Sequence, residues 1–178
     1  MKTFHSAAAF STLALLIGAS IASGDALAVD KTRIGYINAT GACQSALPVF
    51  DGVIRKRPLG VQNEGPQGSA DSFVNCSLPG QSGSQITKVT LDLATIPGGV
   101  IPNNIGCTGI NGFYGGNAKY VTKNVIANAD GTAVTMQWTA ADFNAASFPS
   151  DIFNIQCKMP RGTGIYVIAT YYSEDVGA

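Results

Sequence analysis

The stretch IFNIQCKM, residues 152–159, shows the pattern on which the fold class depends. Apolar side chains occupy every second position of it: Phe153, Ile155, Cys157 and Met159. A period of two is typical of a β-strand that has one face against a core and the other in water. The same alternation occurs in TKVTLDLAT, residues 87–95, and in TAVTMQW, residues 132–138. We therefore predict three strands whose apolar faces line one core and whose polar faces meet solvent.

Further strands are expected at 33–37, 53–57, 71–78, 119–127 and 164–172. Asp130-Gly131 favours the positive φ angles of a tight turn, so residues 119–138 are predicted to form a hairpin. The segment TAADFNAA, residues 139–146, is predicted to be a short helical turn capped by Thr139. About eight short strands separated by turns predict an all-β fold, an antiparallel β-sandwich of immunoglobulin-like or jelly-roll-like topology.

The first 28 residues have the layout of a secretory signal peptide. A basic start at Lys2 precedes the apolar run AAAFSTLALLIGASIA, and Ala26-Leu27-Ala28 precedes the preferred cleavage site at 28/29, with 22/23 as second choice. The run is shorter and more interrupted than the roughly 20 apolar residues of a membrane span. We expect residues 29–178 to be a single β-sandwich domain that is secreted, periplasmic or at the cell surface, with no transmembrane segment after signal removal.

Charge and histidine content exclude several functional classes. Eleven basic and eleven acidic residues cancel, so the chain has no overall field that would attract nucleic acid. The only histidine, His5, lies in the predicted signal peptide. The remaining domain therefore has no Ser-His-Asp or Cys-His nucleophile and no His-ligated metal. It also contains no phosphate-binding glycine motif, and we predict no catalytic residue, cofactor or metal.

An even number of cysteines in an exported chain indicates disulfide bonds. Cys43, Cys76, Cys107 and Cys157 allow three pairings, and their spacing does not choose among them. We adopt the sequential pairing, Cys43–Cys76 with Cys107–Cys157, as the working prediction.

Two stretches are candidate binding sites. In VIRKRPLGVQNEG, residues 53–65, the cluster Arg55, Lys56 and Arg57 is either a patch for an acidic partner or the solvated edge of a sheet, where charges discourage pairing. In CTGINGFYGGNAKY, residues 107–120, Phe113 and Tyr114 stand among glycines. Aromatic side chains on such a loop form a platform for a sugar ring or a protein partner, or they fold back over the core.

Four motifs together carry a resemblance to a known group of proteins: GACQSALP, RKRPLGVQNEG, SFVNCSL and IQCKMPRGTGI. They resemble uncharacterised small exported proteins of gammaproteobacteria, which have a signal peptide, a Cys-containing lead and a late Cys-x-x-Pro-x-Gly-Thr motif. The resemblance covers most of residues 34–172. It implies an exported, disulfide-bonded β-sandwich and carries over no functional residue.

The sequence therefore favours a secreted, non-enzymatic protein that acts in surface recognition or as a component of the cell envelope or extracellular space. An acidic surface, a glycan or a protein is its expected partner. One alternative is a polysaccharide hydrolase that uses a carboxylate pair, for which Glu64 and Asp71 are the nearest candidates. Another is a self-assembling structural subunit, favoured by low charge and exposed strand edges.

Overall fold

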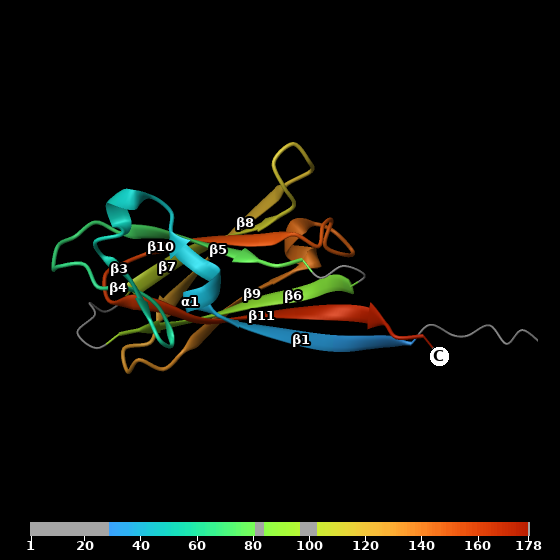
Figure 1. The fold of residues 1–178 in the computed structure, drawn as a ribbon, viewed down its shortest axis with the longest axis horizontal. Coiled ribbons are helices and arrows are strands. Elements are labelled where there is room, and N and C mark those ends of the chain that lie inside the picture. Colours follow the sequence, from blue (N-terminus) through green and yellow to red (C-terminus); the bar gives the residue numbers. More distant parts are fainter. Residues whose placement is uncertain (1–28, 81–83, 97–102, 178) are drawn as a thin grey trace, which may run out of the picture.

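The structure is a computed structural model that describes residues 29–80, 84–96 and 103–177. The predicted signal peptide, including His5, lies outside the described residues. Within the described part of the chain, eleven strands form two antiparallel sheets that pack face to face (Figure 1). The expected all-β class and antiparallel sandwich are thus confirmed.

The two sheets differ in how they are built. Sheet A has the strand order β3 (Ile54–Arg57), β4 (Gly60–Asn63), β11 (Thr163–Asp175), β6 (Ser84–Thr95) and β9 (Val134–Thr139), and β1 (Asp30–Asn38) also pairs with β11. Sheet B has the order β2 (Cys43–Ser45), β5 (Ser72–Leu78), β10 (Phe153–Met159), β7 (Asn103–Asn111) and β8 (Lys119–Ala127). The short helical segments are α1 (Ala39–Ala42), η1 (Pro48–Phe50) and η2 (Ala140–Phe143).

The connectivity identifies which sandwich topology is present. Consecutive strands share a sheet only at the β3–β4 and β7–β8 hairpins, and every other connection between described strands crosses from one sheet to the other. The interleaved orders β4-β11-β6-β9 and β5-β10-β7-β8 are those of a jelly roll. Of the two expected topologies, the chain therefore adopts the jelly-roll one.

The predicted hairpin over residues 119–138 is wrong, because β8 lies in sheet B and β9 in sheet A. The type I′ hairpin turn that Asp-Gly favours needs positive φ at both central residues. Gly131 has a φ of 79°, but Asp130 is not among the described residues with positive φ. The Asp130 carboxylate instead accepts hydrogen bonds from the backbone N–H of Thr132 at 2.9 Å and from its hydroxyl at 2.6 Å. The turn is real, but it directs the chain from one sheet to the other.

Eight of the eleven strands coincide with expected ones, and β2, β4 and β7 were not expected. The omission of β7 matters most, because this strand lies inside sheet B between β10 and β8. Its inward positions include Gly109, where an added Cβ would lie 2.8 Å from the indole nitrogen of Trp138 and 2.9 Å from the ring of Phe153. The glycine leaves room for these two rings and at the same time removes the apolar alternation that identifies a strand.

The predicted apolar faces do form the core. Trp138 and Phe153 are completely buried between the sheets. Phe143 and Phe148 pack edge-on against Phe153, with interplanar angles of 85°. The predicted helical turn is also confirmed as η2, which Thr139 begins with a capping box that includes Asp142.

Candidate functional site

Both disulfides lie on the inner face of sheet B. Cys43–Cys76 joins β2 to β5, and Cys107–Cys157 joins β7 to β10, as the sequential pairing predicted. In each bridge the two cysteines are directly opposite in the strand register, with Cα atoms 4.0 Å apart. The bonds therefore fix the register of two strand pairs, and with it the alignment of the side chains on the outer face of the same sheet.

Uncharged polar side chains form a row across the outer face of sheet B. The register aligns one residue from each strand into a continuous row across the sheet: Gln44, Asn75, Gln156, Thr108 and Thr122. We call these five residues the amide row. The Gln156 side-chain amide donates to the Asn75 carbonyl oxygen at 3.0 Å, and the Thr108 and Thr122 hydroxyls are 2.8 Å apart.

The rows on either side of the amide row mix polar and apolar side chains. One contains Ser77, Asn154, Ile110 and Tyr120, and the other contains Phe73, Lys158, Gly106 and Asn124. Lys158 is the one charged side chain in the three rows, and its ammonium lies 3.0 Å from the carboxylate of Asp71. Beside Gly106, which has no side chain, Asn104, Asn124, Val125 and Ile126 line a hollow of about 340 Å³.

The other two lysines of sheet B are turned away from this face. Lys119 donates to the Phe143 carbonyl oxygen at 3.1 Å, and Lys123 pairs with Asp142 at 2.7 Å, so both tie β8 to η2. Burial raises the pKa of Asp142, but hydrogen bonds from Lys123 and from Thr139 outweigh it and hold the pKa below its ordinary value. The Asp142 carboxylate is thus charged at neutral pH and neutralises Lys123, while the outer face stays without a net charge.

The β7–β8 hairpin carries aromatic side chains at the edge of this surface. Its base is held by the buried Asn111, whose amide donates to the Ser150 carbonyl at 2.6 Å and to the Ile152 carbonyl at 3.0 Å. Gly112 and Gly115 have φ angles of 110° and 84°, which side-chain-bearing residues rarely adopt. The backbone N–H of Gly116 closes the tip by donating to the Phe113 carbonyl at 3.0 Å. The loop thus combines a fixed base with a tight tip.

The tip presents its rings to solvent rather than folding them over the core. Tyr114 is fully exposed and Phe113 is 59% exposed. Tyr120, which sequence reasoning did not single out, is 66% exposed at the start of β8 and points outward in the row next to the amide row. Figure 1 shows the hairpin tip and the η1 turn both projecting beyond sheet B on the side away from sheet A. Exposure of Phe113 and Tyr114 together is what a binding role requires.

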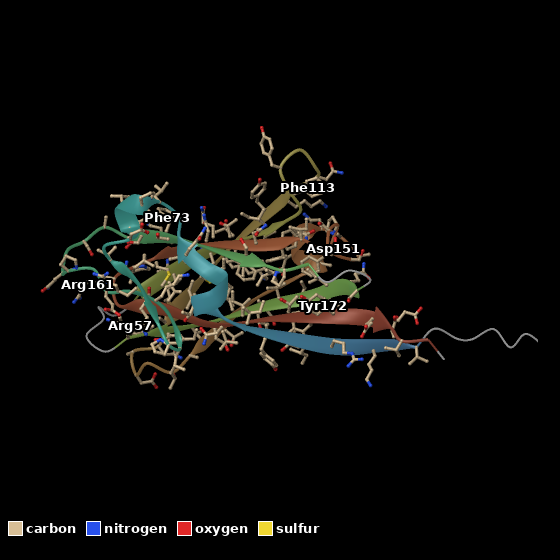
Figure 2. The ribbon with its side chains drawn as sticks, in the orientation of Figure 1. Arg57, Phe73, Phe113, Asp151, Arg161 and Tyr172 are labelled. Atoms are coloured by element: carbon tan, nitrogen blue, oxygen red, sulfur yellow. A yellow bond between two sulfur atoms is a disulfide. The ribbon has the colours of Figure 1, made fainter. Side chains whose placement is uncertain are left out.

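The basic cluster lies elsewhere, on the edge strand β3 of sheet A. Arg57 and Glu64 form a two-pronged ion pair, with one N–H···O distance of 2.6 Å. The hydrogen bond from Arg57 lowers the pKa of Glu64, and the same bond raises the pKa of Arg57. Arg55 and Lys56 stand opposite Gln62 and Val61 of β4. Figure 2 shows Arg57 at the lower left of the molecule and Phe113 near its top, so the two predicted candidates do not form one site.

The carboxylates proposed for a hydrolase are both engaged by cations. Glu64 is held by Arg57, and Asp71 is held by Lys158. Asp92 accepts a hydrogen bond from Thr135 at 2.7 Å. In residues 29–80, 84–96 and 103–177, no cluster of three or more His, Cys, Asp or Glu side chains is suited to hold a metal ion.

Comparisons with known proteins find distant structural likenesses. No protein-family profile and no curated protein sequence matches the chain. A family 11 carbohydrate-binding module of a cellulosomal cellulase of Clostridium thermocellum is 14% identical, with a TM-score of 0.37 over 85% of this chain and 96% of the module. The K1 cleaved adhesin domain of Lys-gingipain from Porphyromonas gingivalis is 13% identical, with a TM-score of 0.33 over 84% of this chain and 99% of the domain.

Latent PorU from Porphyromonas gingivalis is 9% identical, with a TM-score of 0.39 over 87% of this chain. The match spans only 14% of PorU. Within residues 29–80, 84–96 and 103–177, no helix is long and apolar enough to cross a membrane.

Proposed function

We propose that the protein is a secreted, non-enzymatic recognition protein that binds an uncharged glycan on the outer face of sheet B. The observation that carries the proposal is the amide row, a line of uncharged donors and acceptors that crosses all five strands. Tyr120 and the hairpin tip with Phe113 and Tyr114 border this row on the β7–β8 side.

The chemistry of the surface matches that of a sugar chain. Each sugar hydroxyl is both a donor and an acceptor, and side-chain amides and hydroxyls offer both functions at one position. Exposed aromatic rings pack against the apolar faces of sugar rings while their polar edges stay in water. In the amide row, Asn75 and Gln156 already orient each other, so the side chains lose little freedom when a ligand binds.

Charge favours a neutral ligand. The Lys158–Asp71 pair is internally balanced, and no other charge lies in the amide row or in the rows that flank it. The basic cluster Arg55–Arg57 remains the hypothesis for an acidic partner, but Glu64 already neutralises one of its three charges. We therefore expect sheet B to bind a neutral polysaccharide more tightly than an acidic one.

A secreted location is supported by the two buried disulfides, because such bonds persist in oxidising compartments. A non-enzymatic role is supported by the engagement of Glu64 and Asp71 in ion pairs. General acid–base hydrolysis needs one carboxylate that is free to hold a proton and a second that faces it across the substrate.

Affinity gel electrophoresis tests the proposal directly. The purified protein is run in gels containing a neutral soluble polysaccharide, such as a β-glucan, xylan, galactan or mannan, and in gels containing the acidic polymers alginate and polygalacturonate. We expect retardation by at least one neutral polymer and none by the acidic ones. Tyr114→Ala and Gln156→Ala should abolish the retardation. Leu59→Ala, which truncates an exposed apolar side chain in the turn between β3 and β4, should not.

Two outcomes would overturn the proposal. One is retardation by acidic polymers alone that disappears in the triple Arg55, Lys56, Arg57→Ser variant, which would move the binding site to β3. The other is that no polymer in the panel retards the protein while its circular dichroism and intact mass show a folded, disulfide-bonded chain.

A further inference from the structure

Strand β1 is a nine-residue edge strand whose second side is open. It pairs with β11 from Asp30 opposite Asp175 to Asn38 opposite Val167, and among the described strands it has no other partner. Figure 1 shows β1 along the rim of the sandwich, with only β11 beside it. Such an edge exposes a row of backbone hydrogen-bonding groups.

The register shows which backbone groups face outward. Val176 donates its N–H to the Val29 carbonyl at 3.2 Å, which makes Val29 and Val176 a hydrogen-bonded pair. In an antiparallel ladder, hydrogen-bonded pairs alternate with pairs whose N–H and C=O groups point away from the partner strand. Thr32, Ile34 and Tyr36 therefore direct their backbone groups to the free side of β1.

The side chains at these three positions do not protect the edge. On the edge strand β3, three basic residues and Pro58 oppose pairing with another strand. On β1, the outward positions Thr32, Ile34 and Tyr36 carry no charge, and Ile34 is 45% exposed. The edge strands β1 and β3 of sheet A thus differ in the feature that normally prevents association.

We propose that the free edge of β1 binds the same edge of a second copy of this chain, antiparallel and centred on Ile34. This register places Ile34 opposite Ile34 of the second copy and Thr32 opposite Tyr36 of the second copy. Pairs of β-branched and aromatic side chains stabilise antiparallel ladders. The outward backbone groups of one copy then meet those of the other, and sheet A continues from one molecule into the next.

Charge disfavours the neighbouring register that is centred on Arg33. Centring on Ile34 places Lys31 opposite Ile37 and Arg33 opposite Gly35, so no like charges face each other. Centring on Arg33 would put two arginines face to face, and like charges directly opposite are destabilising. Arg33 is in addition neutralised by Glu174, 2.9 Å away. Asn38 donates to the Pro58 carbonyl, so the shared ladder ends at Ile37.

The pairing also extends an apolar surface that already exists. Ile34 is opposite Tyr171 on β11, and Tyr36 is opposite Ala169, so these four side chains lie side by side on the outer face of sheet A. The two-fold axis of an antiparallel strand pair stands perpendicular to the sheet. Both copies therefore direct sheet B to the same side of the assembly. If the proposed function holds, the two glycan-binding surfaces of the dimer face the same direction.

Light scattering coupled to size-exclusion chromatography tests the pairing without any glycan. The protein should elute with twice its chain mass at high concentration and dissociate on dilution. Ile34→Lys and Ile34→Glu should each be monomeric, because each places like charges opposite at the centre of the ladder. A mixture of the two variants should regain twice the chain mass, because lysine then faces glutamate.

The matched control is Ile126→Lys, which adds the same charge to a 62% exposed isoleucine on β8, the edge strand of sheet B. It should associate as the unaltered protein does, and circular dichroism should show all variants folded. The proposal is overturned if the unaltered protein has a single chain mass at every concentration. It is equally overturned if the single-charge variants remain dimeric, or if their mixture stays monomeric.

Discussion

Replacing Gly109 with alanine should destabilise the protein, although glycine-to-alanine changes in a strand usually do the opposite. The new methyl group would lie 2.8 Å from the Trp138 indole nitrogen and 2.9 Å from both its Cδ1 and the Phe153 ring. Trp138 is fully buried and donates to the Val121 carbonyl at 3.0 Å, so its ring has nowhere to move without losing that bond. Overpacking of this kind costs about 1–3 kcal/mol.

The loss of chain entropy in the unfolded state offsets about 0.4–1 kcal/mol of this cost. Weakening of the indole hydrogen bond adds about 1 kcal/mol to it. We therefore expect a net loss of about 1–3 kcal/mol in the free energy of unfolding, or a melting temperature about 3–10 °C lower for a chain of this size. Urea unfolding followed by fluorescence of Trp138, the one tryptophan in the chain, measures it.

Gly41→Ala is the matched control, because an added Cβ there has no heavy atom within 4 Å and should not destabilise the fold. Gly109→Ala should reduce the free energy of unfolding by less when it is combined with Trp138→Phe. The smaller ring removes the atoms that the added methyl group contacts. Equal stability of Gly109→Ala and Gly41→Ala would refute the placement of Trp138 against β7.

Three further outcomes follow from the structure. Removing Cys107–Cys157 by paired alanine substitution should cost about 4 kcal/mol of unfolding free energy, slightly more than removing Cys43–Cys76, because the closed loop has 50 rather than 33 residues; urea midpoints measure both. The lowered pKa of Asp142 stabilises the fold at neutral pH, and this contribution is lost as the pH falls below about 4. Asp142→Asn should therefore have a lower free energy of unfolding at pH 7, and that free energy should fall less steeply as the solution is acidified. Ile34→Lys should weaken binding to an immobilised polysaccharide by about 10²-fold or more but leave the affinity for a short soluble oligosaccharide unchanged, as biosensor measurements in both formats would show.

Strands with strict alternation were predictable from the sequence because one face of each is buried along its whole length. In β10, all four inward residues are apolar and almost completely buried. In β7 the same inward face contains Gly109 and Asn111. Gly109 leaves room for the rings of neighbouring strands, and Asn111 forms hydrogen bonds with the loop at Ser150, so neither is an apolar residue that fills the core. Which strands pair with one another could not be predicted from the alternation alone. For this reason the turn at Asp130 was mistaken for a hairpin.

The loop at the tip of the β7–β8 hairpin could also be predicted from the sequence, because the glycines around Phe113 and Tyr114 indicate a loop. The amide row was not, because its members come from five strands and each is an ordinary polar residue in its own segment. Local pattern shows that Gln156 faces water, but it does not show that Asn75 and Thr108 stand on either side of it.

The disulfides contain the information that local pattern lacks. In an antiparallel pair, two bridged cysteines that are directly opposite place the residue after one opposite the residue before the other. Cys43–Cys76 therefore sets Gln44 against Asn75, and Cys107–Cys157 sets Thr108 against Gln156. The same bonds that join the strands on the buried face thus align four members of the amide row on the exposed face. If the row is the binding surface, loss of either disulfide should weaken glycan binding even where the sandwich remains folded, because the alignment of donors and acceptors depends on the register that the bond holds.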